Sequence, residues 1–414
     1  MKVLLLNTYD TKGGAAIAAT RLWKGLLDVG VDAHFMVQEK FGRDPRIIGP
    51  ATNFGKGMGI LRPHIDRLPL AFYPNRENTF WSVQWLPGNV VNKINEINPD
   101  IVHLHWVNNG YLPIQALPKI KQPIVWTLHD SWAFTGGCHV PQECEKFKTI
   151  CHQCPQLNSG KKKDLSYRTF RKKQKYWQDI NLTIVCLSEW IENNVKASSI
   201  LNGSSVTRIP NGIDTNIYKP ISKVIARDIL HLPKDKKLIL FGALNPTSDQ
   251  NKGFHLLQAA LKKFSSQTKE DVELVIFGTY EPSQPVDLGL KAHYVGWLND
   301  DPTLALLYSS ADVMVVPSLQ EVFPTTAIES VACGTPVVAF NATGLKDIVE
   351  HKASGYLAAP YDPIDLANGL HWILEDESLR KELSVNARNH TLQHFGIHDV
   401  AAKYIELYRK VLAG

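Results

Sequence analysis

The stretch DVMVVPSLQEVFPTTAIES (312–330) predicts a buried strand that passes through a short loop into a helix. The run VMVV that follows Asp312 is apolar throughout, as in the buried strands of parallel sheets. Pro324 suits the first position of a helix, and the two threonines after it suit capping. Two carboxylates, Glu321 and Glu329, therefore lie on either side of a predicted helix start at the carboxyl end of a strand.

The same alternation of short apolar runs with helical stretches recurs along the chain. It begins with KVLLLN (2–7), which is followed by a glycine pair and the helical pattern AAIAATRLWKGLLDVG, and it restarts at KKLILFGAL (236–244). Such alternation is typical of parallel strands joined by crossover helices. The further predicted strands are 31–37, 100–106, 123–130, 181–188, 272–279, 312–318 and 336–340.

This pattern predicts an α/β protein with two doubly wound, Rossmann-like domains that face one another across a cleft. Proline and glycine interrupt regular structure in IPNGIDTNIYKP, so we expect the boundary there. The first domain is expected to span 1–208, with a C-terminal helix of about 396–414 packing back onto it, and the second to span 209–395. Within the first domain, 41–90 and 131–178 are expected to be irregular insertions.

Composition limits the kind of protein and of partner. At about 150 residues per domain, 414 residues predict two or three domains. A hydrophobic content of 44% and a charged content of 21% are ordinary for a globular protein. The net charge is +5, and the segment 161–177 alone holds eight Lys or Arg against one Asp. Because nothing else is broadly basic, a nucleic-acid partner is not expected.

The N-terminus, MKVLLLNTYD, has four consecutive apolar residues before Asn7, too few for the core of a signal peptide. No apolar run approaches the roughly 18 residues that span a bilayer. We therefore expect a cytoplasmic protein, peripheral at the inner membrane face if it associates with membrane. Its cysteines are then expected to be reduced unless they bind a metal.

The chemistry expected around 321–330 follows from the helix start. A helix N-terminus carries about half a positive charge and several free N–H groups, which makes it a natural phosphate site. A carboxylate beside it would bind hydroxyl groups, such as those of a ribose or a hexose. Acidic residues that merely complement the helix dipole would give the same pattern, and the residues alone leave both interpretations open.

The pattern Glu321-x7-Glu329, followed by ACGTPVVA, resembles the signature of family 4 of the retaining nucleotide-sugar glycosyltransferases, which have the GT-B fold. The stretch TLHDSWAFTGGCH (127–139) resembles a subgroup of bacterial transferases of the exopolysaccharide and colanic-acid type. The likeness extends over nearly the whole chain, and its further counterparts are Gly13-Gly14, PNGID (210–214), Lys252-Gly253, Gly278 and 309–312.

The resemblance implies a role for each residue of the signature. Glu329 corresponds to the glutamate that binds the ribose hydroxyls of the nucleotide. Glu321 corresponds to the one that faces the transferred sugar. The loop through Phe323, Pro324 and Thr325 would contact the diphosphate, so the two carboxylates would hold opposite ends of one donor.

Three further positions are implied in donor binding or catalysis. Gly13 and Gly14 match the glycine turn after the first strand. His129, which ends a predicted strand, matches a histidine that contacts and orients the donor sugar. Its alternative role is that of a core histidine bonded to backbone.

Lys252 follows the strand at 236–244, where a cation would neutralise charge on a departing diphosphate. Without the resemblance it could equally be a surface lysine. The chain departs from the family at one point, because the family usually has an arginine just after the glycine of this strand. Asn245 or another cation would have to substitute for it.

No Asp-x-Asp motif occurs, so the metal–diphosphate clamp of other sugar transferases is not evident. The resemblance implies a metal-independent, retaining enzyme that needs no cofactor for catalysis. Its donor would be a UDP- or GDP-sugar, and its acceptor a saccharide or lipid-linked saccharide of the cell envelope. The family's favoured mechanism is front-face substitution, in which the leaving phosphate accepts the proton of the acceptor.

Four of the six cysteines cluster, as Cys138-x5-Cys144-x6-Cys151-x2-Cys154. Four thiolates can bind a structural zinc ion in a tetrahedral arrangement. Only the last pair has the tight spacing of a zinc hairpin, so free thiols and disulfides are alternatives.

The basic segment 161–177 carries Tyr167, Phe170 and Trp177 at helical spacing. A basic amphipathic helix can lie on an anionic membrane, as a transferase with a lipid-linked acceptor would require. A solvated helix with three packing aromatic side chains is the ordinary alternative.

Two rival functions fit much of the same pattern. One is a sugar-nucleotide epimerase on the same fold, which PNGID and the paired glutamates disfavour. The other is a catalytically weak, transferase-like subunit that binds nucleotide-sugars, which the missing arginine leaves open. A dinucleotide dehydrogenase is disfavoured because no G-x-G-x-x-G follows the first strand.

Overall fold

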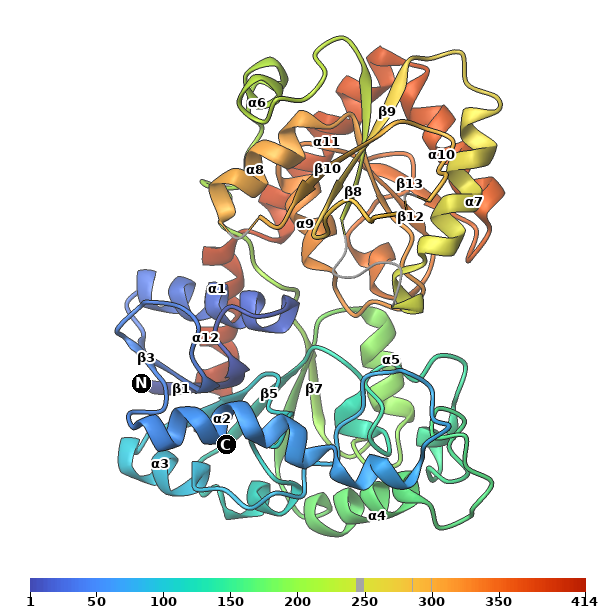
Figure 1. The fold of residues 1–414 in the computed structure, drawn as a ribbon. Helices are drawn as coiled ribbons and strands as arrows, with labels where there is room; N and C mark the ends of the chain where they lie inside the picture. Colours follow the sequence, from blue (N-terminus) through green and yellow to red (C-terminus); the bar gives the residue numbers. More distant parts are fainter. Residues whose placement is uncertain (243–248, 285, 299) are drawn as a thin grey trace. The chain divides into compact units, whose positions relative to one another are not determined.

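The computed structural model describes residues 1–242, 249–284, 286–298 and 300–414. Two compact units divide the chain: residues 1–212 with 398–414 form unit 1, and residues 213–397 form unit 2. Each unit is a parallel sheet covered by helices (Figure 1).

In the sheet of unit 1 the first strand of the chain, β1, is an inner strand. Strands β2 and β3 lie on one side of β1, and β4 to β7 lie on the other. The order is therefore β3-β2-β1-β4-β5-β6-β7, and all neighbouring strands are parallel. The order therefore reverses between β1 and β4, where ligands of such sheets bind. The strands are β1 (Lys2–Tyr9), β2 (Asp32–Glu39), β3 (Ile47–Ile48), β4 (Ile101–Leu104), β5 (Ile124–Leu128), β6 (Leu182–Cys186) and β7 (Ser205–Arg208).

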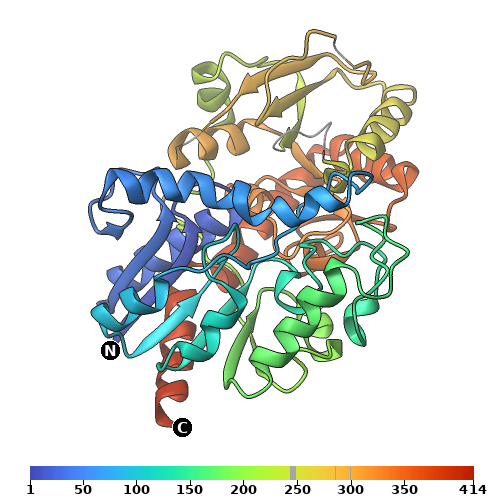
Figure 2. The same cartoon turned by 60° about the horizontal axis from the view of Figure 1, so that its bottom comes forward.

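Helices cover both faces of this sheet. Figure 1 shows α1 and α2 on opposite sides of it, and Figure 2 shows α2 and α4 in front. The helices are α1 (Gly14–Asp28), α2 (Asn53–Asp66), α3 (Val90–Ile97), α4 (Leu165–Trp177), α5 (Glu189–Ala197) and α12 (Ile397–Ala413), with 3-10 turns η1 (Leu68–Phe72), η2 (Ile114–Lys119), η3 (Trp132–Phe134) and η4 (Lys146–Lys148).

The C-terminal helix α12 is part of the core of unit 1. Its Tyr404 and Tyr408 are buried in one apolar cluster with Trp23 of α1 and Phe35 of β2. Both tyrosines also satisfy their hydroxyl groups beneath the sheet, as buried tyrosines require. Tyr408 Oη lies 2.7 Å from His103 Nδ1, and Tyr404 Oη lies 2.9 Å from Thr127 Oγ1. The last residues of the chain thus support β4 and β5.

Unit 2 repeats the arrangement. Among its described residues, six parallel strands have the order β10-β9-β8-β11-β12-β13, which reverses between β8 and β11. The strands are β8 (Lys237–Gly242), β9 (Val272–Phe277), β10 (Ala292–Gly296), β11 (Val313–Val316), β12 (Val337–Phe340) and β13 (Gly355–Ala358). The helices are α6 (Lys223–Ile229), α7 (Phe254–Ser265), α8 (Asp301–Ser310), α9 (Thr325–Ala332), α10 (Pro363–Leu374) and α11 (Glu377–His394), with 3-10 turns η5 (Gln250–Lys252) and η6 (Thr343–Asp347).

The predicted α/β class with two doubly wound sheets is confirmed. The expectation that 131–178 is irregular was wrong over α4, which is a helix of 13 residues. The expectation that 41–90 is irregular was wrong over α2, which is a helix of 14 residues. Three glycines and Pro63 obscure its pattern, since these residues ordinarily interrupt helices. The helix forms because Thr52 caps it by accepting from the Gly55 amide, and because Gly59 allows close packing on β2.

None of the helices in the described residues is both long enough and apolar enough to cross a membrane.

Asp312, just before β11, joins several elements of unit 2. Its buried carboxylate accepts from Lys223 Nζ at 2.6 Å, from Arg227 Nη2 at 2.7 Å and from the Leu238 amide at 2.8 Å. Arg380 Nε lies 3.4 Å away. Burial alone would raise the pKa of Asp312, but its cationic neighbours outweigh burial and hold that pKa below its ordinary value. The carboxylate is therefore the counter-ion of a buried cationic cluster.

Replacing Asp312 by Asn should lower the free energy of unfolding by about 3–5 kcal/mol, because it leaves buried cations uncompensated. Urea unfolding followed by circular dichroism measures this loss. Asp235→Asn, at a carboxylate that is 80% exposed, is the matched control and should change stability by less than about 0.5 kcal/mol. The stabilisation by Asp312 should also fade as the pH falls below about 4, since a depressed carboxyl pKa stabilises the fold only while the group is ionised. Equal effects of the two substitutions would contradict this role.

Candidate active site

Three loops meet at the carboxyl edge of the second sheet, next to the reversal point between β8 and β11. They are η5 after β8, the segment between β11 and α9, and η6 after β12. Gly253, at the end of η5, has a φ of +65°, and an added Cβ would lie 1.9 Å from the carbonyl oxygen of Pro317. Only glycine allows this approach, which brings η5 against the end of β11.

Asn251 fastens η5 to the loop that carries Glu321. Its side chain donates to the Gln320 carbonyl at 2.8 Å and accepts from the Gln320 amide at 3.1 Å. Its carbonyl accepts from the Leu319 amide at 2.8 Å. These bonds fix the residues on either side, Lys252 and Glu321, relative to one another.

Lys252 and Glu321 form the charged centre of this edge. Lys252 Nζ donates to Glu321 Oε1 at 2.7 Å, and the two side chains are 30% and 18% exposed. The carboxylate of Glu321 raises the pKa of Lys252 against the opposing effect of burial, so the amine stays charged. The structure therefore brings together two of the residues that the sequence had separated by 69 positions.

The N-terminus of α9 follows directly. Pro324 is the N-cap, which the sequence had placed at the first helical position, and no side chain caps the helix. Thr325 and its neighbour Thr326 are half-buried, whereas Phe323 is buried. An uncapped N-terminus presents N–H groups and a partial positive charge to an anion.

The third loop holds the Glu321 segment from the other side. Thr343 Oγ1 accepts from the Glu321 amide at 3.1 Å, and the Gly344 amide donates to the Glu321 carbonyl at 2.8 Å. A Cβ on Gly344 would lie 1.8 Å from the carbonyl oxygen of Val322, so this position requires glycine. Glu321 is thus positioned by backbone and by two neighbouring loops.

Glu329 lies on α9 but is only 3% exposed. Tyr308 of α8 donates its hydroxyl to Glu329 Oε2 at 2.7 Å, and burial together with this carboxylate raises the pKa of Tyr308. The carboxylate is therefore fixed by Tyr308, a partner that no sequence pattern indicated. Asn245 lies outside the described residues.

In unit 1, the corresponding edge carries Gly13, Gly14 and His129. Gly13 is the N-cap of α1 with a φ of +91°, and an added Cβ would meet no atom within 4 Å. The conformation, rather than crowding, requires glycine here, and the helix start is open. His129 directly follows β5 and is half-buried.

A second histidine holds His129 in place. His105, which follows β4 and is 3% exposed, has its Nδ1 3.0 Å from His129 Nε2. In the described part of the chain, His105 Nε2 is buried without a hydrogen-bonding partner. Burial lowers the pKa of His129 to about 4 although Asp130 opposes it, and burial holds the pKa of His105 well below its ordinary value. Both rings are therefore neutral at pH 7.

Asp130 organises the adjacent network. One of its oxygens accepts from His139 Nδ1 and from Trp106 Nε1, both at 2.6 Å, while His139 Nε2 lies 2.9 Å from Ser82 Oγ. This order of Ser, His and Asp resembles a hydrolytic triad, but Ser82 has no exposed surface. The network is therefore structural, and it orients Trp106 at the end of β4.

The predicted zinc site gains no support from the structure. Cys138, Cys144, Cys151 and Cys154 are free thiols that lie near enough to influence one another electrostatically, and burial raises the pKa of Cys151 to about 12. Yet nowhere in the described ranges are three or more His, Cys, Asp or Glu side chains grouped so as to hold a metal ion.

Of the two interpretations of 161–177, the structure favours the helix with packing aromatic side chains over the membrane face. Phe170 and Trp177 are buried in the fold and Tyr167 is half-buried. Lys173 is also fully buried, 3.5 Å from the centroid of the Trp132 ring, and burial lowers its pKa to about 7. The helical spacing of the aromatic residues reflects core packing.

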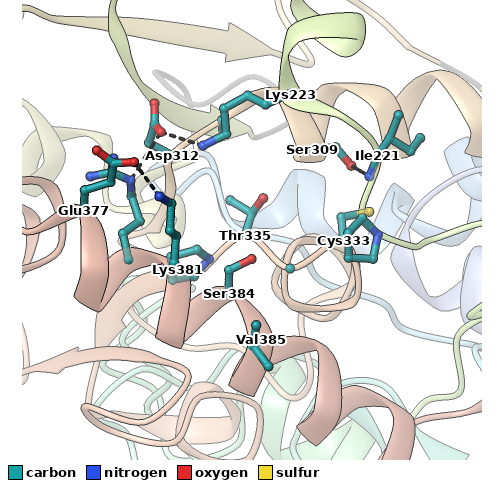
Figure 3. Close-up of a pocket in the computed structure, with 15 residues that line it drawn as sticks. Ile221, Lys223, Ser309, Asp312, Cys333, Thr335, Glu377, Lys381, Ser384 and Val385 are labelled. Atoms are coloured by element: carbon teal, nitrogen blue, oxygen red, sulfur yellow. Dashed lines mark hydrogen bonds and ion pairs between the residues drawn. The ribbon is translucent and has the colours of Figure 1, made fainter.

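A cavity of about 520 Å³ lies at the opposite, amino edge of the second sheet (Figure 3). Lys223, Asp312, Glu377 and Lys381 line it, together with Cys333. Figure 3 shows the cations paired, Lys223 with Asp312 and Lys381 with Glu377. Its charges are thus already compensated, and its position is away from the loops that carry Lys252 and Glu321.

Two family models match the chain. The model described as Glycosyltransferase Family 4 matches residues 12–217, and the model described as Glycosyl transferases group 1 matches residues 223–390. The fold and the two matching models thus define a GT-B glycosyltransferase. The chain belongs to the glycosyltransferases that these two models together describe.

Individual relatives agree with this class. The D-inositol 3-phosphate glycosyltransferase of Thermobispora bispora is 26% identical over 431 residues, which cover 97% of this chain and 90% of that protein. Among solved structures, sucrose-phosphate synthase from Thermosynechococcus elongatus has a TM-score of 0.70 at 20% identity and covers the whole of both chains. HepE from Anabaena, in complex with UDP and glucose, has a TM-score of 0.65 at 18% identity and covers 99% of this chain and 100% of its own. These two structures are similar in fold.

The histidine pair gives a test by NMR. With selectively labelled histidine, His105 and His129 should remain neutral from pH 8 to about pH 5, whereas free histidine titrates near 6.5. We expect the proton of His105 on Nδ1, because a buried N–H without an acceptor is rarer than an unpaired acceptor.

The lowered pKa values of the two histidines also determine how the stability of the fold changes with pH. Below pH 6.5 the unfolded chain binds protons that the folded chain excludes until about pH 4, so the pair should lower stability as the pH falls through this window. A His129 resonance that titrates near pH 6.5 would contradict the pairing.

Proposed function

We propose that this chain is a retaining, metal-independent glycosyltransferase. It moves a sugar from a UDP- or GDP-sugar to a hydroxyl of a saccharide or lipid-linked saccharide, in the assembly of exopolysaccharide or another cell-envelope glycan. Unit 2 binds most of the donor, and unit 1 binds the acceptor. The observation that carries the proposal is the Lys252–Glu321 pair beside the uncapped N-terminus of α9.

This arrangement suits a sugar diphosphate. The N-terminus of α9 and Lys252 both offer positive charge to the phosphates, and the Lys252 amine has three N–H groups, of which Glu321 accepts one. As the bond to the sugar breaks, negative charge builds on the leaving diphosphate, where these groups stabilise it. Together they supply charge that a divalent ion supplies in transferases with an Asp-x-Asp motif.

The two glutamates have separate proposed roles. Glu321 is held at the charged edge by Thr343 and Gly344, where it faces the transferred sugar. Glu329, held by Tyr308, accepts from the ribose hydroxyls. Because Glu329 is only 3% exposed, we infer that the ribose lies directly against α9.

His129 is proposed to contact and orient the donor sugar. Its ring is neutral at physiological pH, so it acts as a hydrogen-bonding group and leaves the acceptor proton to the departing phosphate. In this front-face step the acceptor oxygen bonds to the anomeric carbon while the bond to phosphate breaks. The acceptor proton passes to the phosphate oxygen, so no enzyme nucleophile is needed.

Named relatives support the substrate class. The Anabaena structure contains UDP and glucose, which supports a UDP-sugar donor. The Thermobispora relative is named for D-inositol 3-phosphate, a polyhydroxylated acceptor, which supports transfer to a hydroxyl. The resemblance of 127–139 to bacterial polysaccharide transferases supports the envelope pathway.

A panel of UDP-, GDP- and ADP-sugars, assayed for transfer and for hydrolysis in the presence of EDTA, tests the proposal. We expect turnover with one donor. For the common α-configured donors, retention should leave the new glycosidic bond axial, which NMR of the anomeric proton shows. Tight nucleotide binding without turnover would instead identify a binding subunit. Interconversion of the donor sugar without transfer would identify an epimerase.

Substitutions at the charged edge should separate binding from turnover. Lys252→Gln and Glu321→Gln should each lower kcat by about 10²–10³-fold, because they act on charge at the reacting bond. Glu329→Gln should weaken nucleotide binding about tenfold, since a ribose hydroxyl loses its charged acceptor. Steady-state kinetics and calorimetric titration of the nucleotide measure the two effects.

Glu382→Gln, at an exposed position on α11, is the control and should leave both quantities unchanged. If the three site variants behave like this control while the protein remains folded, the assignment of the site is wrong.

A further inference from the structure

Four aromatic rings form a row along the carboxyl edge of the first sheet. Tyr9 is the last residue of β1, Phe41 follows β2 by two residues, and Trp106 follows β4 by two residues. These three strand ends are neighbours, because the sheet has the order β2-β1-β4. Phe80, from the segment between η1 and α3, contacts Trp106 and continues the row. The aromatic row is defined by these residues, Phe41, Tyr9, Trp106 and Phe80.

Each ring of the aromatic row contacts the next one. The ring centroids are separated by 5.8 Å for Phe41 and Tyr9, by 6.0 Å for Tyr9 and Trp106, and by 5.7 Å for Trp106 and Phe80. The two ends of the row are its most exposed rings, since Phe41 is 48% exposed and Phe80 is 43% exposed. The two inner rings are half-buried. Two exposed rings are therefore held apart by two others.

The polar network of Asp130 positions one half of the row. Asp130 Oδ2 accepts from Trp106 Nε1 at 2.6 Å and also binds His139 Nδ1 at 2.6 Å. The His139 ring in turn lies 4.7 Å from the centroid of Phe80, in an edge-to-face contact. A ligand would thus meet rings that are already in place, which lowers the entropy cost of binding.

A cation flanks each end of the row. Lys12 Nζ lies 5.5 Å from the ring centroid of Phe41 and 5.7 Å from that of Tyr9. At the other end, the guanidinium carbon of Arg67 lies 5.0 Å from the ring centroid of Phe80. Both cationic residues are exposed. Because ammonium and guanidinium groups only donate hydrogen bonds, each end of the row offers donors beside an apolar ring.

Such a surface suits a saccharide. A pyranose ring has faces of C–H groups, which pack on aromatic rings, and a rim of hydroxyl groups, which accept hydrogen bonds. Sites for small molecules are typically built in this way, from aromatic surface with a few polar groups. The location agrees, because the order of this sheet reverses between β1 and β4, where ligands of doubly wound sheets bind.

We propose that the aromatic row binds the acceptor, and that this acceptor is an oligosaccharide of more than one sugar unit. One pyranose ring covers about one aromatic ring, so a ligand that contacts both Phe41 and Phe80 has to extend past the two rings between them. A single sugar or a cyclitol would leave one exposed end of the row uncovered. The inference rests on the proposed function, which assigns the acceptor to unit 1, and adds the kind of acceptor to it.

A nucleic acid strand is a poorer occupant of the row. Bases also stack on aromatic rings, but proteins that bind single strands add a cationic groove that follows the phosphates. Here the cations stand at the ends of the row, and the carboxylate of Glu39 acts on Lys12 electrostatically. Uncharged sugar rings match the uncharged centre of the row better.

An array of bacterial surface glycans, from single sugars to hexasaccharides, tests the proposal when it is probed with the full chain. The glycan that binds best and the single sugars of which it is built are then titrated by calorimetry. The glycan should bind at least about tenfold more tightly than any of its single sugars, because it covers more than one ring.

The double variant Phe41→Leu/Phe80→Leu removes the two exposed rings but keeps apolar side chains. It should lose at least about tenfold in affinity for the best glycan. Its binding of UDP or GDP and its hydrolysis of the donor should equal those of the parent. Tyr176→Leu is the matched control, because Tyr176 is a half-buried ring of unit 1 with Lys175 Nζ 5.8 Å from its centroid, but it lines a cavity with Pro123 at the amino edge of the sheet. This control should bind the glycan as the parent does.

Circular dichroism should show that all variants are folded. Three results would overturn the inference: no glycan bound by the parent, single sugars bound as tightly as longer glycans, or equal affinity of the parent and the Phe41→Leu/Phe80→Leu variant. Loss of UDP or GDP binding in this variant would also overturn it and would identify a nucleotide as the occupant. Glycan binding that this variant loses, in a chain that turns over no sugar nucleotide, would support the row as a glycan site and contradict only the proposed function.

Discussion

The ion pair between Lys252 and Glu321 is the interaction on which the interpretation of unit 2 depends. It joins the loop after β8 to the loop after β11, and these two strands are neighbours because the order of the sheet reverses between them. Gly253 allows the two loops to approach, and Asn251 bonds them together. A pair of opposite charges is thereby held, part-exposed, beside a helix start that has no side-chain cap.

Unit 1 positions its site by a different means, which is a buried polar network. Tyr408 and Tyr404 of the C-terminal helix bond to His103 and Thr127 on neighbouring strands, and His105 bonds to His129 at the strand ends. Because buried polar groups are costly when unpaired, such a network restricts the rings to few arrangements. The last helix of the chain thus helps to order the edge of the sheet that carries His129.

Local patterns predicted most of the framework. The strands around 312–318 and 236–244 were predictable because parallel strands are buried on both faces and form short apolar runs. The Glu321 and Lys252 positions were predictable because strand ends of such sheets meet at one edge. Their pairing through Asn251 and Thr343 was not, since polar side chains that bond to backbone leave no periodic signal.

Local patterns were insufficient at two places for related reasons. The aromatic spacing in 161–177 suits a membrane face as well as a helix with packing aromatic side chains, because periodicity reports only that side chains share a face; in the structure Phe170 and Trp177 face the core. Helix α2 was missed because its glycines and Pro63 resemble a loop. One of these glycines has a tertiary cause, since Gly59 packs against the backbone of β2.

The most direct measurement is a crystal structure of the full chain with UDP or GDP, whichever binds. We expect phosphate oxygens within about 3 Å of Lys252 Nζ and of the first amides of α9, the distance of a hydrogen bond. A nucleotide bound elsewhere, such as in the cavity beside Asp312 and Lys381, with Lys252 still engaged only by Glu321, would contradict it.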